Sequence, residues 1–375
     1  MQLIECSGSP YQMGTMQGEQ CKKIIQESEK FLNNNPFIKQ LLHDIIKPNL
    51  LIQSLKKIAG MTAFPTLYKE REVYDRLKGI ADGAGVALEL ISFCQIMEIL
   101  LNQPLYSIGA CTTLGITDKF YIHRGPVVLK NFDYIKGFEK FIILRRSEPG
   151  RGYKSIELTF AQMGGCHTGM NEKGLCISYN YGLSREGIKL KLPYTLIFQK
   201  CLEKFDNTSD VINFLLDQKF SHSSIVTVAD LANNIKVIEL SPEHKAIREI
   251  VDGRYTVATN FFITPKMQEY DLPHDAFYSQ LLPKEIRGIR IHRSNEIRYN
   301  QALEMIRKRK KVSLRYLFSV LKDHTPGTDG DDDSICRHSD FFNTQASMVM
   351  LPAYKTVYVS IGNPCKTKYK KFKIK

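Results

Sequence analysis

The pattern of apolar residues changes at Cys111, and this change constrains the fold more than any other feature of the 375-residue chain. Before it, residues 11–34 carry apolar residues at helical spacing, and residues 88–101 form an apolar run long enough for a buried helix. After it, short runs rich in β-branched and aromatic residues alternate with turn residues, which is typical of strands. We therefore expect a helical front segment, residues 1–110, joined to a strand-rich body, residues 111–375.

The strand-rich body contains blocks of strands separated by blocks of helices. We predict helices at residues 192–205, 208–217, 294–309 and 313–322, and further strands at 223–229, 235–240, 254–260, 346–351 and 356–361. Blocks of this kind favour layers of an α+β fold over alternating βαβ units.

The composition is that of a globular protein with free thiols. Hydrophobic residues make up 43% of the chain and charged residues 24%, so the chain can bury a core without disulfide support. The nine cysteines are odd in number and no pair shows CxxC spacing, so we predict neither a disulfide framework nor a zinc site. His123, His167, His324 and His338 also lack metal-ligand spacing, and we expect no metal and no cofactor.

The start of the chain shows no secretory signal, and no apolar window is long enough for a transmembrane helix. Together with the free thiols, this favours the cytoplasm. The net charge of +13 indicates either a lysine-rich proteome or an acidic partner. Dense basic runs lie at residues 307–311 and 366–375. We expect the second run to be a solvated tail. No known nucleic-acid-binding signature is present, so nucleic acid is not expected as a partner.

The segment Gly109 to Thr113, GACTT, is the first candidate for chemistry. A thiol that attacks the carbonyl group just before it needs a close approach, which the small residues Gly109 and Ala110 permit. After such a cut, Cys111 would be a new N-terminus. Its α-amine, with a reference pKa of about 8, could act as the base for its own thiol. A buried structural cysteine ahead of a strand fits the same five residues.

Three polar residues at predicted strand ends are further candidates. Asp133, in KNFDY, could pair with an arginine and hold an amine in place, although Asn and Asp also favour turns. Asn180 and Asn260 could each donate an amide hydrogen to a developing oxyanion. A capping or turn role is the common alternative for an asparagine.

The order of short motifs along the chain resembles that of one family. The motifs are GSPYQMGTMQGEQ (8–20), CTT (111–113), NFDY (131–134), GMNEKGL (169–175), TN (259–260), CRH (336–338) and GNPC (362–365). This order resembles the acyl-coenzyme A:6-aminopenicillanate acyltransferase family of N-terminal-nucleophile (Ntn) hydrolases. Bile salt hydrolases and penicillin V acylases are its more distant relatives. The resemblance spans nearly the whole chain.

The resemblance implies an α+β fold, a four-layer αββα sandwich of two antiparallel sheets. It also implies autocleavage between Ala110 and Cys111. One chain would then give an αβ heterodimer, in which residues 1–110 stay associated with the catalytic residues 111–375. Ala110 departs from the glycine that commonly precedes the cysteine in this family.

The resemblance also implies roles for single residues. Cys111 would be the nucleophile, Asp133 would orient the new amine, and Asn180 and Asn260 would be oxyanion and substrate-positioning amides. The family has a serine–arginine pair near the start of a late helix. The corresponding segment here, HRSNEIR at 292–298, has a different order, so either Arg298 or Arg293 would take that role.

The implied reaction passes through an acyl-cysteine. A hydrolase of linear amides would give the acyl group to water, and an acyltransferase would give it to an amine. The substrate would be a small acyl amide or an acyl thioester, and the basic charge favours a thioester on coenzyme A or on an acidic carrier protein. The alternative is a non-catalytic basic protein on the same fold that binds anionic lipid or nucleic acid.

Overall fold

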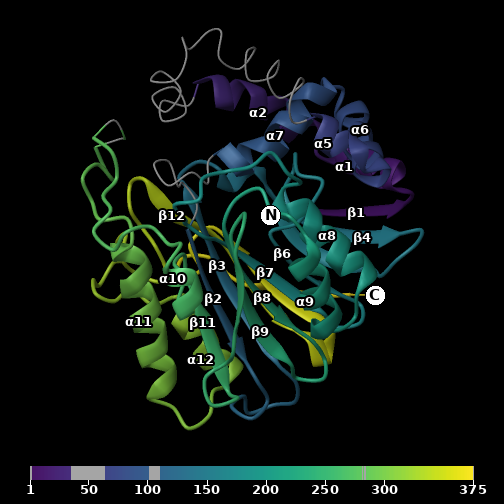
Figure 1. Ribbon diagram of the computed structural model, residues 1–375. Helices are drawn as coiled ribbons and strands as arrows, with labels where there is room; N and C mark the ends of the chain where they lie inside the picture. The colour runs from purple at the N-terminus through teal and green to yellow at the C-terminus, as the bar shows by residue number, and fades with distance from the viewer. Residues whose placement is uncertain (1, 35–63, 101–109, 281, 283, 375) are drawn as a thin grey trace.

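The computed structural model describes residues 2–34, 64–100, 110–280, 282 and 284–374. In this part of the chain, two β-sheets lie face to face, and helices cover the outer face of each (Figure 1). Gly109, just ahead of the predicted cut, lies outside the described residues, as does the predicted helix end at residue 101.

The first sheet has eight strands and carries the N-terminus of the chain. Its order is β1 (Gln2–Gly8), β4 (Ile142–Pro149), β5 (Ser155–Phe160), β6 (Thr168–Asn171), β7 (Cys176–Tyr181), β8 (Ser224–Ala229), β9 (Ile235–Leu240) and β10 (Lys245–Arg248). Neighbouring strands run antiparallel except β1 and β4, which are parallel.

The second sheet has six strands, all antiparallel to their neighbours. Its order is β11 (Tyr255–Ala258), β2 (Ala110–Ile116), β3 (Val127–Ile135), β12 (Phe342–Leu351), β13 (Thr356–Ile361) and β14 (Lys370–Lys373). The C-terminal basic run therefore includes an edge strand, and the solvated tail predicted for it is wrong over this stretch. Lysines on an edge strand hinder pairing with a further chain.

Helices complete the outer layers on both sides. The first sheet is covered by α8 (Tyr194–Lys204), α9 (Thr208–Asp217) and the helices of the N-terminal segment: α1 (Pro10–Gln20), α2 (Lys22–Asn34), α5 (Phe64–Lys69), α6 (Arg71–Ala84) and α7 (Leu88–Leu100). The second sheet is covered by α11 (Arg293–Arg307) and α12 (Leu314–Leu321). The short elements α10 (Pro265–Gln268), η2 (Glu139–Phe141) and η3 (Pro352–Tyr354) lie in connections. These layers confirm the predicted α+β αββα sandwich.

The helices α1 and α6 pack unusually closely. Gly14 and Gly18 on α1 face Gly79 and Gly83 on α6, and a Cβ atom at any of the four would lie 2.2–2.4 Å from a backbone oxygen of the other helix. Only glycine allows the two backbones to approach this closely. The glycines of the segment GSPYQMGTMQGEQ therefore dock the N-terminal helices against each other.

The N-terminal segment differs from its prediction in one respect. Residues 1–110 were expected to be mainly helical, yet β1 opens the segment and joins the sheet of the strand-rich body. Ile4 and Cys6 alternate with more exposed neighbours and pack in one hydrophobic cluster with residues of α1 and α6, while the backbone of β1 pairs with β4, far along the chain. This pairing ties the front segment to the body. No described helix is long and apolar enough to cross a membrane.

Candidate active site

Cys111 is the second residue of β2 and is fully buried between the two sheets. On β3 its cross-strand neighbour is Phe132. Because side chains alternate along a strand, Ala110 and Thr112 face the opposite side, toward α11. The Cys111 backbone thus separates the layer between the sheets from the layer beneath α11.

Two side chains bind the backbone of Cys111. Its N–H donates to Asn260 Oδ1 at 2.9 Å, and its carbonyl oxygen accepts from Arg298 Nη1 at 2.8 Å. Arg298 Nη2 also donates to Asn260 Oδ1 at 3.2 Å, which links the two side chains. Arg298, on α11, is fully buried. Burial lowers its pKa to about 10.

The structure distinguishes between the two candidate arginines. Arg298 contacts Cys111, whereas Arg293 pairs with Asp333 at 2.9 Å, and 57% of its side chain is exposed. A serine–arginine pair of the kind that the resemblance implies is also present on α11, although its order in the sequence differs from the family's. Arg298 Nε donates to Ser294 Oγ at 3.2 Å. The geometry therefore brings Arg298, and not Arg293, to the candidate site.

Asp133 lies on β3 directly opposite Ala110, the residue before the predicted cut. One carboxylate oxygen accepts from Thr344 Oγ1 at 2.7 Å. The other is 3.8 Å from Arg298 Nη1 and has no hydrogen-bond partner among the described residues. Burial raises the pKa of Asp133, while Arg298 and Arg337 oppose this shift. A buried carboxylate oxygen without a donor is costly, so this atom is suited to receive an amine.

Asn180 has its polar atoms committed to the protein. Its amide nitrogen donates to the backbone oxygens of Ala258 and Thr259 at 3.0 and 3.1 Å, and its oxygen accepts from Thr113 Oγ1 at 2.7 Å. These bonds hold the end of β11, from which Asn260 projects. The geometry gives Asn180 a role in positioning the end of β11. Its predicted role as an oxyanion donor stays a prediction.

Lys130 is a residue at the site that the sequence interpretation left without a role. It lies on β3, is fully buried, and is within hydrogen-bonding contact of the Cys111 side chain. Its ammonium group also donates to the Tyr179 backbone oxygen. Burial raises the pKa of the Cys111 thiol, whereas the Lys130 charge lowers it. The available signal was a lysine within the apolar strand PVVLKNF, in step with Phe132.

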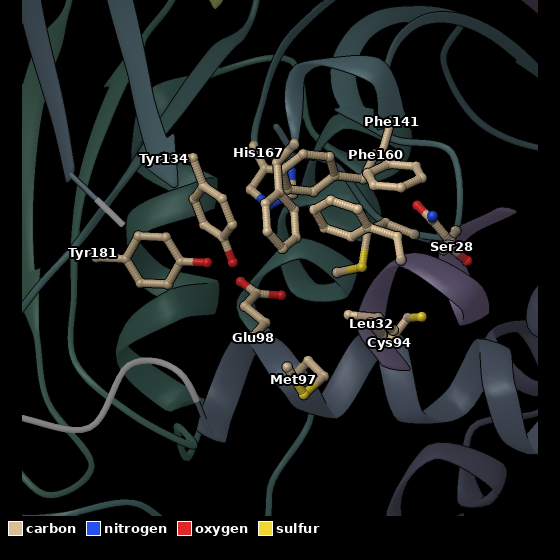
Figure 2. A pocket seen from close by; sticks show the side chains of 14 residues that line it. Ser28, Leu32, Cys94, Met97, Glu98, Tyr134, Phe141, Phe160, His167 and Tyr181 are labelled. Atoms are coloured by element: carbon tan, nitrogen blue, oxygen red, sulfur yellow. The ribbon is translucent and has the colours of Figure 1, made fainter. Parts of the chain in front are cut away.

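An apolar cavity of about 60 Å³ lies next to Phe132, the cross-strand neighbour of Cys111. Figure 2 shows the side chains that line this cavity. Phe132 packs against Tyr134, Phe160 and His167, with ring centroids 5.8, 5.6 and 5.1 Å away. All three line the cavity, together with Ser28, Phe31, Leu32, Cys94, Met97, Glu98, Phe138, Phe141, Gln162, Met163 and Tyr181. One aromatic ring thus separates the candidate nucleophile from a largely aromatic chamber.

A second cavity, of about 20 Å³, lies on the other side of the site and is more polar. Ala110 and Asn260 line it, and so do charged side chains, among them Arg290, Asp332 and Arg337. The start of β2 therefore lies between an aromatic chamber and a small charged one.

Glu98 is a buried carboxyl group in the wall of the aromatic chamber. It lies on α7, and its Oε2 accepts from Thr195 Oγ1 at 2.7 Å. Oε1 has no hydrogen-bond partner within the described part of the chain. The carboxylate points toward the hydroxyl groups of Tyr134 and Tyr181 (Figure 2). Burial raises the pKa of Glu98 from 4.5 to about 7.

This shift predicts how stability depends on pH. Because folding raises the Glu98 pKa, the stability that its protonated form contributes is complete below pH 4.5 and is lost as pH rises to about 7. The Glu98→Gln variant lacks this loss. The melting temperature of the variant minus that of the wild type should therefore rise between these pH values and then level off. Glu72→Gln, at an exposed position on α6, is the control. A difference independent of pH would contradict the buried, titrating carboxyl group.

Comparison with known proteins identifies the family. Residues 123–366 match the sequence model of the family described as acyl-coenzyme A:6-aminopenicillanic acid acyl-transferase. This range covers more than half of the chain, and the protein belongs to that family, which confirms the resemblance in the motifs. The family indicates amide hydrolysis or acyl transfer. The matched range begins after Cys111.

More distant similarities were also found. The protein is 21% identical over 269 residues to Protein dcd1A of Dictyostelium discoideum, a match that covers 64% of this chain and 59% of that relative. A solved Caenorhabditis elegans N-acylethanolamine-hydrolyzing acid amidase ortholog is 16% identical, with a TM-score of 0.45 over 71% of this chain and 100% of its own. Penicillin V acylase from Agrobacterium tumefaciens is 13% identical, with a TM-score of 0.40 over 67% and 82%.

Proposed function

We propose that the protein cuts itself between Ala110 and Cys111 and then uses Cys111 as an N-terminal nucleophile in amide hydrolysis or acyl transfer. The observation that carries the proposal is the convergence of Asn260, Arg298 and Asp133 on the start of β2. These side chains surround the backbone at the predicted cut. A structural cysteine within a strand needs no such surroundings.

The cut follows from an attack of the Cys111 thiol on the Ala110 carbonyl carbon. The peptide nitrogen leaves as the amine of Cys111, and a thioester forms between Ala110 and the Cys111 sulfur. Water then hydrolyses this thioester, which releases residues 1–110 with a free carboxylate and restores the thiol. The α-amine that results lies beside Asp133, whose unpartnered Oδ2 would accept from it.

Turnover would use the same atoms. The α-amine takes the thiol proton, and the thiolate attacks the substrate carbonyl. The α-ammonium group then gives that proton to the leaving amine or thiol, which leaves an acyl-cysteine. Lys130 supports the thiolate, because a buried positive charge next to a thiol lowers the pKa of that thiol. Asn260 Nδ2 donates to the Tyr181 backbone oxygen at 2.8 Å and retains a second hydrogen for an oxyanion.

The two cavities indicate the kind of substrate. The aromatic chamber next to Phe132 suits an apolar acyl group. The charged cavity at Ala110 and Asn260 suits a polar leaving group or acceptor. The net charge of +13 supports a thioester donor on coenzyme A or on an acidic carrier protein. All nine cysteines, each within the described residues, are free, which supports a reducing, cytoplasmic location.

The test is the mass of the protein before and after exposure to substrate. Denatured wild-type protein should give two pieces, residues 1–110 and 111–375. After brief reaction with an N-acyl amide carrying an aromatic acyl group, followed by acid quenching, the larger piece should carry one acyl group on Cys111. An acyl group on another residue would contradict the proposed nucleophile. An uncut chain without any adduct would favour a non-catalytic binding protein.

A further inference from the structure

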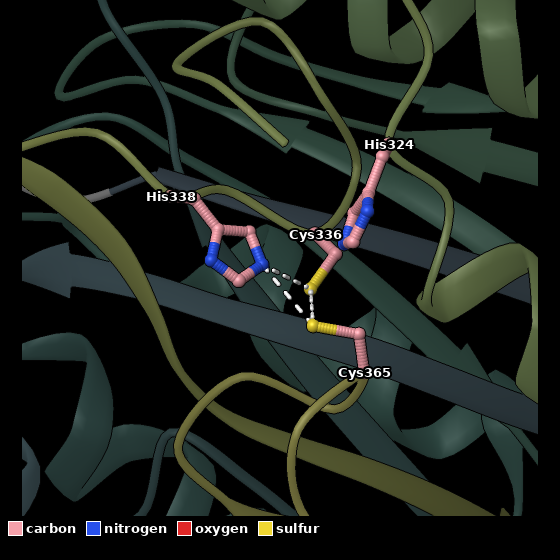
Figure 3. A group of neighbouring side chains, drawn as sticks. All are labelled: His324, Cys336, His338 and Cys365. Atoms are coloured by element: carbon pink, nitrogen blue, oxygen red, sulfur yellow. Dashed lines mark hydrogen bonds between the residues drawn. The ribbon is translucent and has the colours of Figure 1, made fainter. Parts of the chain in front are cut away.

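Four potential metal ligands meet beside the start of β12 and the end of β13 in the second sheet (Figure 3). His324 follows α12, Cys336 and His338 precede β12, and Cys365 follows β13. Their ligand atoms all lie within 4.8 Å of one another. His324, Cys336 and His338 belong to the connection between α12 and β12, and Cys365 belongs to the connection between β13 and β14. Figure 3 shows that the four side chains gather around the two sulfur atoms.

The distances within this cluster fit one tetrahedral ion. The two sulfur atoms are 3.6 Å apart, and His338 Nε2 is 3.3 Å from Cys336 Sγ and 3.2 Å from Cys365 Sγ. A zinc ion with bonds of about 2.3 Å to sulfur and about 2.0 Å to nitrogen places two sulfurs about 3.8 Å apart. The same geometry places sulfur and nitrogen about 3.5 Å apart. The observed separations differ from these by a few tenths of an ångström.

The His324 ring provides an independent indication of a ligand. Its Nδ1 lies 3.0 Å from the Thr328 backbone oxygen, so Nδ1 carries the proton and donates it there. This leaves a lone pair on Nε2. Nε2 is buried and lacks a hydrogen-bond partner among the described residues. A backbone carbonyl that fixes the tautomer of a ligand histidine in this way is a common second-sphere contact in metal sites.

We propose that His324, Cys336, His338 and Cys365 form a zinc site. Two thiolates and two imidazoles in a tetrahedral arrangement are the ligand set that selects zinc. Four protein ligands leave no open position for water or substrate, so the ion is structural rather than catalytic.

The sequence predicted no metal because its ligands are far apart along the chain. Spacing rules detect zinc loops in which pairs of ligands are two to five residues apart. Here Cys336 and His338 are close in sequence, whereas Cys365 arrives through the β12–β13 hairpin and His324 through the end of α12. The sequence spacing predicted no metal site, whereas the fold brings the ligand atoms of these four residues within 4.8 Å of one another.

The zinc site is connected to the candidate active site by hydrogen bonds. Arg337 lies between two of the ligands, and its backbone N–H donates to Thr344 Oγ1 at 2.9 Å. Thr344 Oγ1 in turn donates to Asp133 Oδ1 at 2.7 Å. An ion that fixes the loop around Arg337 therefore also fixes the carboxylate expected to hold the α-amine.

The experiment measures the metal content of the full-length protein, purified with reductant and without chelator from medium that contains zinc. The wild type should hold about one zinc ion per chain. Cys365→Ser and His324→Ala should each lower zinc at least tenfold. Cys176→Ser, at a buried cysteine on the other sheet, and Cys111→Ala should retain it. Cobalt exchanged into the wild type should show thiolate charge-transfer absorption, which Cys365→Ser removes.

Several results would overturn the proposal. One is wild-type protein with less than about a tenth of a zinc ion per chain. A second is peptide mapping that shows a disulfide between Cys336 and Cys365 in the reduced preparation. A third is loss of zinc in Cys111→Ala, which would place the ion at the nucleophile. The wild-type zinc content and cobalt spectrum decide the question even if a variant fails to fold. None of these readouts depends on activity.

Discussion

Replacing Cys111 with alanine is expected to leave one uncut chain and to lower turnover by roughly 10⁴-fold or more, because removal of an enzyme nucleophile can cost about 10⁶-fold. The thiol makes both attacks, on the Ala110 carbonyl and on the substrate, and no other group near the start of β2 in the described structure replaces it. A denaturing gel or intact mass measures the cut, and an N-acyl amide assay measures the turnover.

A matched control separates this chemistry from a loss of packing. Cys176→Ala removes an equally buried thiol from β7, on the facing sheet, and should keep both the cut and most of the turnover. Cys111→Ala should fold, because alanine fits a strand position that is already enclosed. A Cys111→Ala protein that cuts itself and turns over substrate at the wild-type rate would contradict the assignment of Cys111 as the nucleophile.

The sequence was most informative where a short motif coincides with a strand end. Asp133 and Asn260 were predicted from polar residues at the ends of apolar runs together with the family resemblance. The structure brings Asn260 to the Cys111 N–H and Asp133 to the position opposite Ala110. The choice between Arg293 and Arg298 could not be made from the sequence. The two are five residues apart on α11, which rotates their side chains by about 140° on a helix. Only the packing of α11 on the sheet determines which one faces inward.

The features missed in the sequence depend on contacts between distant segments. The strand β1 joins the first sheet only by pairing with β4, more than a hundred residues later. The zinc ligands meet only after the β12–β13 hairpin has formed. Lys130 is different, because strand alternation alone places it on the same face as Phe132 and opposite to Asp133. A buried lysine two residues from an aromatic ring in an apolar strand was therefore a usable signal.

The Asn260 side chain is expected to matter for rate more than for stability. Its oxygen accepts from the Cys111 N–H and from Arg298 Nη2, while its nitrogen has one hydrogen available beyond the bond to Tyr181. Loss of one oxyanion donor costs about a hundredfold or more in turnover. Asn260→Ala should therefore lower kcat by about this factor in protein that remains folded.

Two further variants distinguish a catalytic Asn260 from a structural one. Asn260→Asp keeps an oxygen for the Cys111 N–H and for Arg298 but loses the amide donor, so it should allow the cut and still lose turnover. Asn180→Ala removes three buried hydrogen bonds that hold the end of β11, so it should lower the melting temperature more than Asn260→Ala does. Rate and melting temperature are measured on the same samples. If Asn260→Ala lowers the melting temperature while each folded molecule retains the wild-type rate, Asn260 is structural and the oxyanion donor is another group.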